Sequence, residues 1–394
     1  MTPTEAREPP LPVLLLAAAC LSMFVTSLSG NSRAPFLLDM SRDLSASLPM
    51  VANLMALTSV SWGVASLVAG AASDRWGRQP FLIGGPIALA GVLVCVATAP
   101  SYLAVAIWAT LGGCCGGTIT SVLFAEVSAC VENRQRGRAL GWVMAGQSLT
   151  LLVGVPLSAF LGAYVGWRGV NLVVAGCAVV ASLSMLGVTW GRASSARAAG
   201  TKAPTWAAAL TPVVLRLLAI GVAERICYGL TAVYFATFLQ STYGLSLAGI
   251  ALPLAIIALG SIGGTVLGGQ LADKLPNRMH VFAAAMLASG VAALALFGWT
   301  TSLELSIGLG FAYALLNAIA RPSLLAALAN VPDHIRGTVM GLNVTSASFG
   351  WLGAATLGGW MIATTGFPAF GPLTAAIALL GAVLALMGRK PQAG

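Results

Sequence analysis

The sequence predicts an all-α membrane protein in which twelve transmembrane helices form two pseudo-symmetric bundles of six. The first reason is composition: 58% of the 394 residues are hydrophobic and only 8% are charged, whereas soluble domains carry about 25% charged residues. The second is that apolar runs of about 20 residues, the length that crosses a bilayer as a helix, recur along the chain. The third is a set of short motifs that returns after half the chain length.

Each predicted span is a largely apolar run that ends in polar, charged, glycine or proline residues. The first run has no small-residue cleavage site after a short apolar core, and it ends near Asn31 and Arg33. We therefore interpret it as a retained span and not as a signal peptide. In chain order the predicted spans are 11–33, 48–71, 80–98, 101–128, 139–162, 168–189, 212–239, 246–271, 279–299, 303–329, 337–363 and 368–388.

Lysine and arginine are concentrated at the termini and in the loops after even-numbered spans, for example at Arg136 and Arg138. The loops on the other side hold Arg42 and Arg168, with Arg33 at the edge of a span. Because cytoplasmic loops carry the excess of basic residues, both termini are predicted to be cytoplasmic, with the chain in the cytoplasmic (inner) membrane. This topology explains the net charge of +9 without a nucleic-acid partner.

Two motifs recur in register along the chain. The pattern Gly-x-x-x-Asp-Arg at 70–75 returns as Gly-x-x-x-Asp-Lys at 269–274, with the aspartates 199 positions apart. The pattern Arg-Gly-x-x-x-Gly begins at Arg136 and again at Arg336, 200 positions apart. Two six-helix halves are the architecture of many secondary transporters, which bind substrate between the halves. The predicted domains are an N-terminal bundle at 1–190, a cytoplasmic linker at 191–211 and a C-terminal bundle at 212–394.

The stretch GAASDRWGR at 70–78 resembles the signature between spans 2 and 3 of the major facilitator superfamily. In its arrangement of motifs, the chain looks most like the twelve-span drug:proton antiporters and related metabolite exporters. The resemblance covers essentially the whole chain, and it implies the major facilitator fold and a latch that closes the cytoplasmic gate. The implied gating residues are Gly70, Asp74, Arg75, Gly77 and Arg78, with Asp273 and Lys274 at the repeated position.

The chemistry of this stretch suits a gate. Gly70 lets two helices approach closely, and the Asp74 carboxylate can meet the N-terminus of a facing helix, a contact worth about 0.3–1 kcal/mol. Gly77 permits a tight reversal of the chain. The alternative is an ordinary cytoplasmic loop, which accounts for the arginines but not for Gly70 and Asp74 at a fixed spacing.

The fifth span contains a second resemblance. Gly154 and Pro156 match part of the glycine-proline signature of the family's antiporters, and a proline kinks a membrane helix. The glycines that usually follow are replaced by Leu157 and Ser158. A further departure is Trp108, which stands where the drug:proton antiporters usually carry an arginine. Any proton coupling must therefore use other residues.

Ionisable residues lie at membrane depth at three places in the predicted spans, where charges are costly and mark functional sites. Glu224 and Arg225 are in the seventh span, Arg321 is in the tenth, and Arg33 is toward the outer end of the first. Three arginines against one glutamate give a net charge of about +2. This excess predicts an anionic or zwitterionic substrate.

Helical spacing places Tyr228 on the face of Glu224, and Asn317 on the face of Arg321. Glu224 is the candidate proton carrier. The alternative is that Glu224 and Arg321 form an ion pair that only joins two helices. The predicted substrate-binding residues are Asn31, Arg33, Arg225, Tyr228, Asn317 and Arg321.

These observations predict a secondary transporter, working as a monomer among membrane lipids, that exports a small organic compound in exchange for protons. A proton symporter or uniporter importing an organic-acid-like metabolite and a broad multidrug exporter are the alternatives. No enzyme is predicted, because the spans contain no nucleophile with a base and no histidine at depth. No cofactor or metal is predicted, since the seven cysteines lack metal-ligand spacing and there is no phosphate-binding loop.

Overall fold

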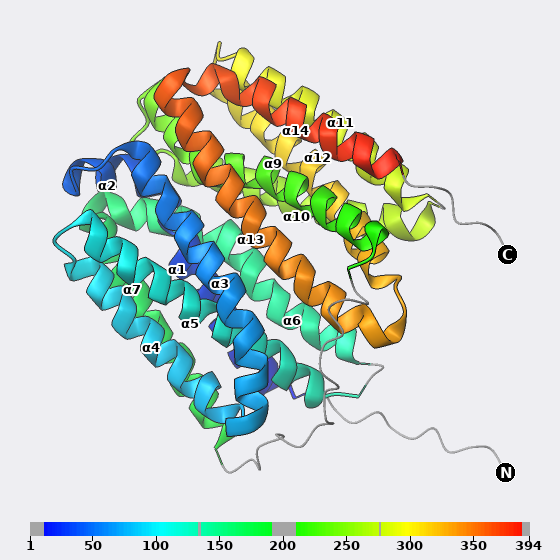
Figure 1. The fold of residues 1–394 in the computed structure, drawn as a ribbon. Coiled ribbons are helices and arrows are strands. Elements are labelled where there is room, and N and C mark those ends of the chain that lie inside the picture. The colour runs from blue at the N-terminus through cyan, green and yellow to red at the C-terminus, as the bar shows by residue number, and fades with distance from the viewer. Residues whose placement is uncertain (1–11, 133–134, 191–209, 276, 388–394) are drawn as a thin grey trace, which may run out of the picture.

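The structure is a computed structural model that describes residues 12–132, 135–190, 210–275 and 277–387 (Figure 1). For six residues within these ranges it describes the backbone alone: Ala71, Asp74, Asp333, His334, Arg336 and Gly337. The predicted linker at 191–211 lies outside the described residues except for its last two positions.

The regular structure of the described residues is helical throughout. In chain order the elements are α1 (Val13–Asn31), η1 (Ala34–Phe36), α2 (Leu37–Asp43), α3 (Leu48–Trp76), α4 (Gln79–Thr98), α5 (Tyr102–Ala129), α6 (Arg136–Leu149), the π-helical turn η2 (Thr150–Gly154), α7 (Val155–Thr189), α9 (Pro212–Tyr243), α10 (Ala251–Lys274), α11 (Arg278–Gly298), α12 (Leu303–Ala329), α13 (Asp333–Thr364), η3 (Phe367–Ala369) and α14 (Phe370–Leu386).

Nine segments of the described chain are long and apolar enough to cross a membrane. One of them, Arg136–Thr189, contains both the fifth and the sixth predicted spans, because α7 continues through a break at Gly166. Helices α9 and α13, at the seventh and eleventh predicted spans, are not among the nine. The count of twelve crossings stays a prediction.

The helices pack in two groups, and corresponding pairs of helices pack in each (Figure 1). In the first helix group, α1 to α7, α3 packs on α5 and α4 packs on α7. In the second helix group, α9 to α14, α10 packs on α12 and α11 packs on α14. The paired helices hold corresponding places in the two halves of the predicted order. The packing therefore repeats at half the chain length, as the sequence motifs do. Between the groups, α3 packs on α13, and α10 packs on η2 and α7.

Two serines cap corresponding helices of the two groups. Ser101 accepts a hydrogen bond from the Ala104 backbone N–H at the start of α5, at 3.3 Å. Ser302 does the same for the Leu305 N–H at the start of α12, at 3.2 Å. A serine N-cap satisfies one of the free N–H groups of a helix start and is worth about 1 kcal/mol. This cap is a third feature that repeats at half the chain length.

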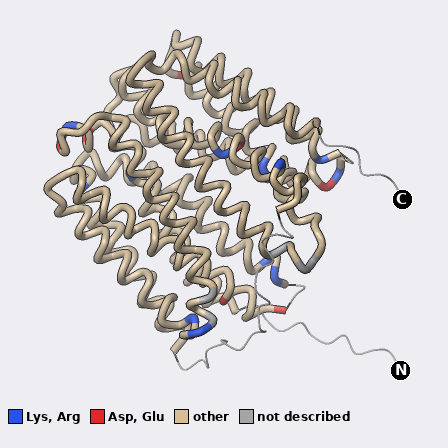
Figure 2. Tube along the Cα trace, viewed as in Figure 1, with Lys and Arg blue, Asp and Glu red and all other residues tan. Residues whose placement is uncertain are grey.

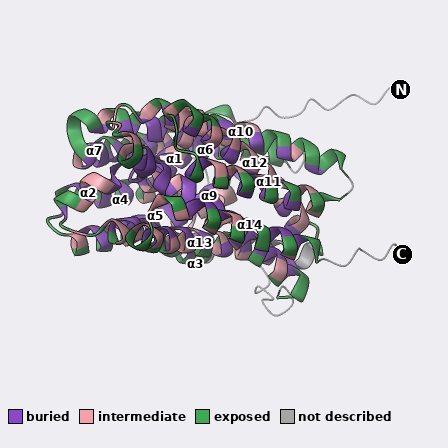
Figure 3. Ribbon diagram, turned by 90° about the horizontal axis from the view of Figure 1, so that it is seen from above, coloured by how far each residue is buried: buried purple, intermediate pink, exposed green. Residues whose placement is uncertain are grey.

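The outer surface of the helices is apolar. Leu103, Leu252 and Val291 are each about two-thirds exposed, and seen from above the exposed residues lie on the outside of the bundle while buried residues fill its interior (Figure 3). Charged residues gather near the helix ends, with few along the middle (Figure 2). Such a surface is stable in lipid, where every backbone polar group is satisfied within its own helix.

Glycines bring neighbouring helices to backbone contact within each group. In the first group, a Cβ atom on Gly113 or Gly117 of α5 would collide with the backbone of α3. In the second, a Cβ atom on Gly260, Gly264 or Gly268 of α10 would collide with backbone carbonyl oxygens of α12. Small residues at such crossings are the usual means of close packing in membranes, where apolar burial gives little driving force.

A cluster around Trp167 fixes the turn between the fifth and sixth predicted spans. Gly166 adopts a φ of 65°, which lets the chain bend within α7. The buried Trp167 donates its indole N–H to Asp43 Oδ2 at 2.8 Å. The Arg168 guanidinium lies over the Trp167 ring at 4.3 Å and donates to the carbonyl oxygens of Ala97 and Ala99. The cluster thus ties α7 to the ends of α2 and α4.

Replacement of Asp43 by alanine is expected to lower the free energy of unfolding by about 1–2 kcal/mol, because the buried indole N–H of Trp167 loses its acceptor. The matched control is Asp39→Ala, which removes only the weak surface pair with Arg42 at 3.8 Å. Thermal unfolding of both variants in detergent checks this: equal melting temperatures for the two would contradict it.

Candidate substrate cavity

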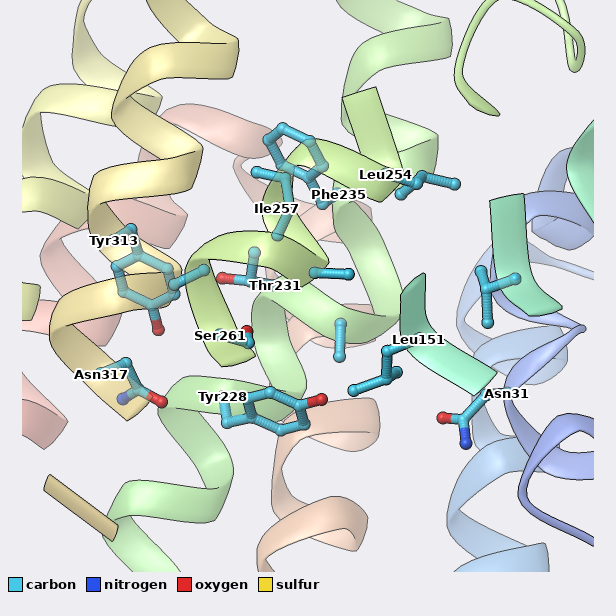
Figure 4. Close-up of a pocket in the computed structure, with 14 residues that line it drawn as sticks. Asn31, Leu151, Tyr228, Thr231, Phe235, Leu254, Ile257, Ser261, Tyr313 and Asn317 are labelled. Carbon is cyan, nitrogen blue, oxygen red and sulfur yellow. The ribbon is translucent and has the colours of Figure 1, made fainter. Parts of the chain in front are cut away.

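A cavity lies between the two helix groups (Figure 4). The first group contributes residues of α1, η2 and α7, and the second contributes residues of α9, α10 and α12. None of the described lining residues is an acid, a lysine or an arginine. The lining residues are Asn31, Leu151, Val155, Tyr228, Thr231, Ala232, Phe235, Leu254, Ile257, Ala258, Ser261, Tyr313, Ala314 and Asn317.

The cavity has an apolar part and a polar part. Phe235, Ile257 and Leu254 lie together at one side (Figure 4). At the other side, the side chains of Tyr228 and Asn317 bring an oxygen and a carboxamide to the wall. The side chains of α9 and α12 become more polar toward one end of the cavity. One helical turn beyond Tyr228 and Asn317, both helices carry charged groups.

Those charged groups form a compact ion cluster beside the cavity. Glu224 has no exposed side-chain surface, and it accepts hydrogen bonds from Arg225 Nε at 2.6 Å and Arg225 Nη2 at 2.5 Å. Arg321 Nη1 donates to Glu224 Oε2, the oxygen that also accepts from Arg225 Nε, at 3.3 Å. The Arg225 guanidinium also lies over the Tyr228 ring, 4.5 Å from its centre, a cation–π contact.

The two arginines of the cluster differ in exposure. The Arg321 side chain is 30% exposed, whereas that of Arg225 is 13% exposed. Arg321 makes one hydrogen bond to Glu224, so most of its donors are available to another group. The contact between Glu224 and Arg321 is compatible with both sequence hypotheses, a proton carrier or an ion pair that joins α9 and α12.

Arg33 lies apart from this cluster. Its guanidinium is buried, and Nη1 donates to Thr58 Oγ1 of α3 at 2.8 Å. Arg33 is not among the residues that line the cavity, whereas Asn31, two positions earlier, is. Arg225 and Arg321 do not line the cavity either, but they pair with Glu224 beside it. The cluster beside the cavity therefore holds two arginines and one glutamate, and not the three arginines that the sequence grouped together. The chain turns at the end of α1, which sends the two side chains to different neighbours.

The two helix groups also touch at the end of the cavity near η1. Gln240 of α9 donates to the Pro35 carbonyl oxygen at 2.9 Å. On the same side, a Cβ atom on Gly359 of α13 would lie 2.9 Å from Pro49 of α3. Toward the opposite end, α3 and α13 diverge (Figure 1).

Comparison with known proteins identifies the family. A sequence model of the Major Facilitator Superfamily matches residues 19–279 and again residues 217–394. The chain belongs to the major facilitator superfamily. It is accordingly a membrane transporter of small molecules and not an enzyme, and the predicted all-α membrane fold is confirmed.

Individual members of the superfamily align with most of the chain. A chloramphenicol resistance protein of Streptomyces lividans is 26% identical over 289 residues, 73% of each chain. The inner membrane transport protein YdhP of Escherichia coli O157:H7 is 25% identical over 391 residues, 97% of this chain and 96% of its own. A bacterial homologue of the human lysosomal transporter Spinster, solved in an inward-facing and unoccupied conformation, has a similar fold. Its TM-score is 0.70 at 15% sequence identity, and the match covers 96% of this chain and 94% of the other.

The predicted gating stretch of this superfamily member lies where α3 meets α4. Gly77 ends α3 with a φ of 83°, a conformation that suits glycine. Arg78 is buried and pairs with Glu126 of α5 at 3.4 Å, whereas Arg75 is exposed. Gly70 faces Ser121 of α5. The side chain of Asp74, central to the predicted latch, lies outside the described residues.

The other predicted gating residues are divided between an end of α10 and the middle of the fifth span. Asp273 and Lys274 are exposed at the end of α10. Gly154 ends the π-helical turn η2 and packs against Phe24 and Leu28 of α1, and Pro156 follows directly in α7. A π-helical turn beside a proline is a common place for a helix to bend, and such turns are frequent at functional sites.

Sequence reasoning missed several residues of these sites. Leu254, Ile257 and Ser261 of α10 line the cavity, although no charged or unusual residue distinguishes them. Among the described lining residues none comes from α5, the fourth predicted span. Glu126 of α5, which the sequence analysis did not single out, pairs with Arg78. Arg78 and Glu126 are 48 positions apart in the sequence, so no local spacing indicates that they form a pair.

Proposed function

We propose that this chain exports a small zwitterionic or anionic organic compound in exchange for protons, by alternating access across the cytoplasmic membrane. The observation that carries the proposal is the position of Glu224, fully buried between Arg225 and Arg321 beside a cavity that both helix groups line. Ionisable groups inside a membrane are expensive and are kept where they move ions or substrate. The cluster holds both the carboxyl that can carry a proton and a guanidinium that can bind an anion.

Substrate and proton compete for the Glu224 carboxylate, and this competition couples export of the substrate to entry of the proton. A zwitterion would place its carboxylate on the partly exposed Arg321 and its cationic group against ionised Glu224. A proton on Glu224 removes the charge that holds the cationic group. Substrate and proton then bind in turn, and each lowers the affinity for the other by the same factor. The name of the Streptomyces lividans relative, a chloramphenicol resistance protein, also supports export.

A second candidate applies to a substrate with no cationic group. A proton on Glu224 weakens its hold on Arg321, which frees Arg321 for a simple anion. Proton and anion would then favour each other's binding, so they would move together as symport. The observation that favours this alternative is the hydrogen bond from Arg321 to Glu224, because a bound anion would compete with Glu224 for the same guanidinium. Broad multidrug export is supported by the largely apolar lining of the cavity.

The proposal includes the orientation and the gates. Both termini are proposed to be cytoplasmic, so the end where α3 meets α4 faces the cytoplasm, and the chain is proposed to work as a monomer in lipid. Gly70, Asp74, Arg75, Gly77 and Arg78 are proposed to close the cytoplasmic side, with Asp273 and Lys274 on the opposite group. Gly154 and Pro156 are proposed to let the fifth span bend. The contact of Gln240 with Pro35 supports a state closed on the other side.

Purified protein in liposomes with a lumenal pH dye tests the coupling. Substrates are added outside, one at a time, from a panel of zwitterions, organic anions and lipophilic cations. Exchange makes the lumen alkaline as substrate enters, and symport makes it acidic, so the sign of the change separates the two candidates. A response to the cations alone would contradict the proposed substrate charge.

Arg321→Ala is expected to lower the response to anions and zwitterions about 10- to 100-fold, because a charge-assisted hydrogen bond is worth about 1.5–3 kcal/mol. The control is Arg42→Ala, since the Arg42 side chain is 78% exposed and outside the cavity. Initial rates at several substrate concentrations provide the measurement. Equal rates for the two variants would show that Arg321 binds no anionic group.

A further inference from the structure

Asn317 lines the cavity, and its carboxamide has an unused acceptor. Asn317 is 1% exposed, and its Oδ1 atom has no hydrogen-bond partner. Its Nδ2 atom faces the Met286 sulfur of α11 at 4.0 Å. A thioether accepts and does not donate, so this contact favours the nitrogen on the side of Met286. The oxygen lies on the side toward Tyr228 (Figure 4).

Asn31 presents a second carboxamide from the other helix group. Its Nδ2 atom donates to the Ser27 carbonyl oxygen, one turn back in α1, at 2.8 Å. A carbonyl can only accept, so this bond also fixes the orientation of the amide. The Asn31 oxygen is left on the side toward which the Tyr228 hydroxyl points (Figure 4).

We propose that the substrate carries hydrogen-bond donors, N–H or O–H, that meet the amide oxygens of Asn317 and Asn31 from opposite sides of the cavity. The hydroxyl groups of the lining rotate and serve as donor or acceptor, so they make no such demand. The two amide oxygens require a donor, because each amide nitrogen already faces another acceptor and so leaves the oxygen on the opposite side. Each N–H or O–H group of the substrate satisfies one of these two acceptors, whereas a donor-free acid of the same shape leaves both unsatisfied.

The apolar part of the cavity indicates the chemistry of the rest of the substrate. Phe235, Ile257 and Leu254 accept an aromatic or branched body on the side away from Tyr228 and Asn317. The compound is then an apolar-bodied organic acid with amino, amido or hydroxyl groups near its carboxylate. This inference rests on the proposed function for the carboxylate, and on the two asparagines alone for the donors.

Three acids with one carbon skeleton test the donors: 3-phenylpropanoate without a donor, phenyllactate with a hydroxyl group, and phenylalanine with an ammonium group. Binding to the purified full chain in detergent is measured by titration calorimetry. Phenyllactate and phenylalanine are expected to bind at least about tenfold more tightly than 3-phenylpropanoate. Asn317→Leu is expected to reduce this preference to less than about threefold, with Asn31→Leu acting in the same direction.

Asn171→Leu is the matched control. Asn171 of α7 is buried and also has an unpartnered Oδ1 atom, but it does not line the cavity. This variant should keep the full preference for donor-bearing acids. Equal binding of the three acids by the wild type, or an unchanged preference in both Asn317→Leu and Asn31→Leu, overturns the inference. A retained preference without proton movement in the liposome assay contradicts the proposed function and leaves the donor inference standing.

Discussion

Glu224→Gln is expected to abolish transport driven by a pH gradient while exchange of labelled for unlabelled substrate continues. Glutamine keeps the shape and a hydrogen-bond acceptor for Arg225 and Arg321, but it does not take up or release a proton. Gradient-driven flux should fall to the level of liposomes without protein. Measuring both fluxes in the same liposome preparation separates coupling from substrate binding.

The same variant leaves the half-buried Arg225 and the partly exposed Arg321 without an acid. Removing one partner of a buried ion pair costs about 3–5 kcal/mol, so Glu224→Gln should also melt at a lower temperature. Glu304→Gln is the control, because Glu304 is exposed in the first turn of α12 and makes the same chemical change outside the cluster. Gradient-driven flux that survives in Glu224→Gln would assign the cluster to the alternative role of joining α9 to α12.

Gly264→Leu is expected to prevent α10 from packing on α12, with a loss of more than about 3 kcal/mol of stability. A Cβ atom on Gly264 would collide with the Leu315 backbone oxygen and would lie 2.9 Å from the Ala318 Cβ atom. Backbone atoms of a membrane helix cannot move aside as a flexible side chain does, so the helices must separate. The yield of monodisperse protein and its melting temperature are the measurements.

The neighbouring glycine provides a close control for this prediction. A Cβ atom on Gly263 of α10 would meet no atom within 4 Å. Gly263→Leu therefore makes the same substitution one position away, on a face with room for it. Similar losses for the two variants would mean that leucine disturbs α10 itself, and that the contact with α12 is not the cause.

The positions of the helices could be predicted from the sequence because the signal is local. A bilayer needs about 20 apolar residues per crossing, and this requirement is visible in each segment alone. The half-length repeat was also visible, and the paired packing of α3 on α5 and of α10 on α12 follows it. The depth of Glu224, Arg225 and Arg321 in the membrane was also predicted locally, by counting residues from the ends of each predicted span.

The face that each helix turns inward could not be predicted in this way. In lipid the outer and inner faces of a helix are both apolar, so hydropathy does not distinguish them. The lining residues Ile257 and Leu254 of α10 look like any others in an apolar span, and only the packing of α10 against η2 and α7 turns them toward the cavity. The orientation of the Asn317 amide likewise depends on Met286, a residue of another helix.

By itself, the sequence determined the helical membrane fold, its duplication and the depth of the charges, since each depends on neighbours along the chain. The tertiary structure alone decided which charges meet. It joined Glu224 to Arg321, 97 positions away, and Arg78 to Glu126, and it separated Arg33 from the cavity. These contacts depend on how helices rotate and cross, which is set by close packing at glycines and turns between distant segments.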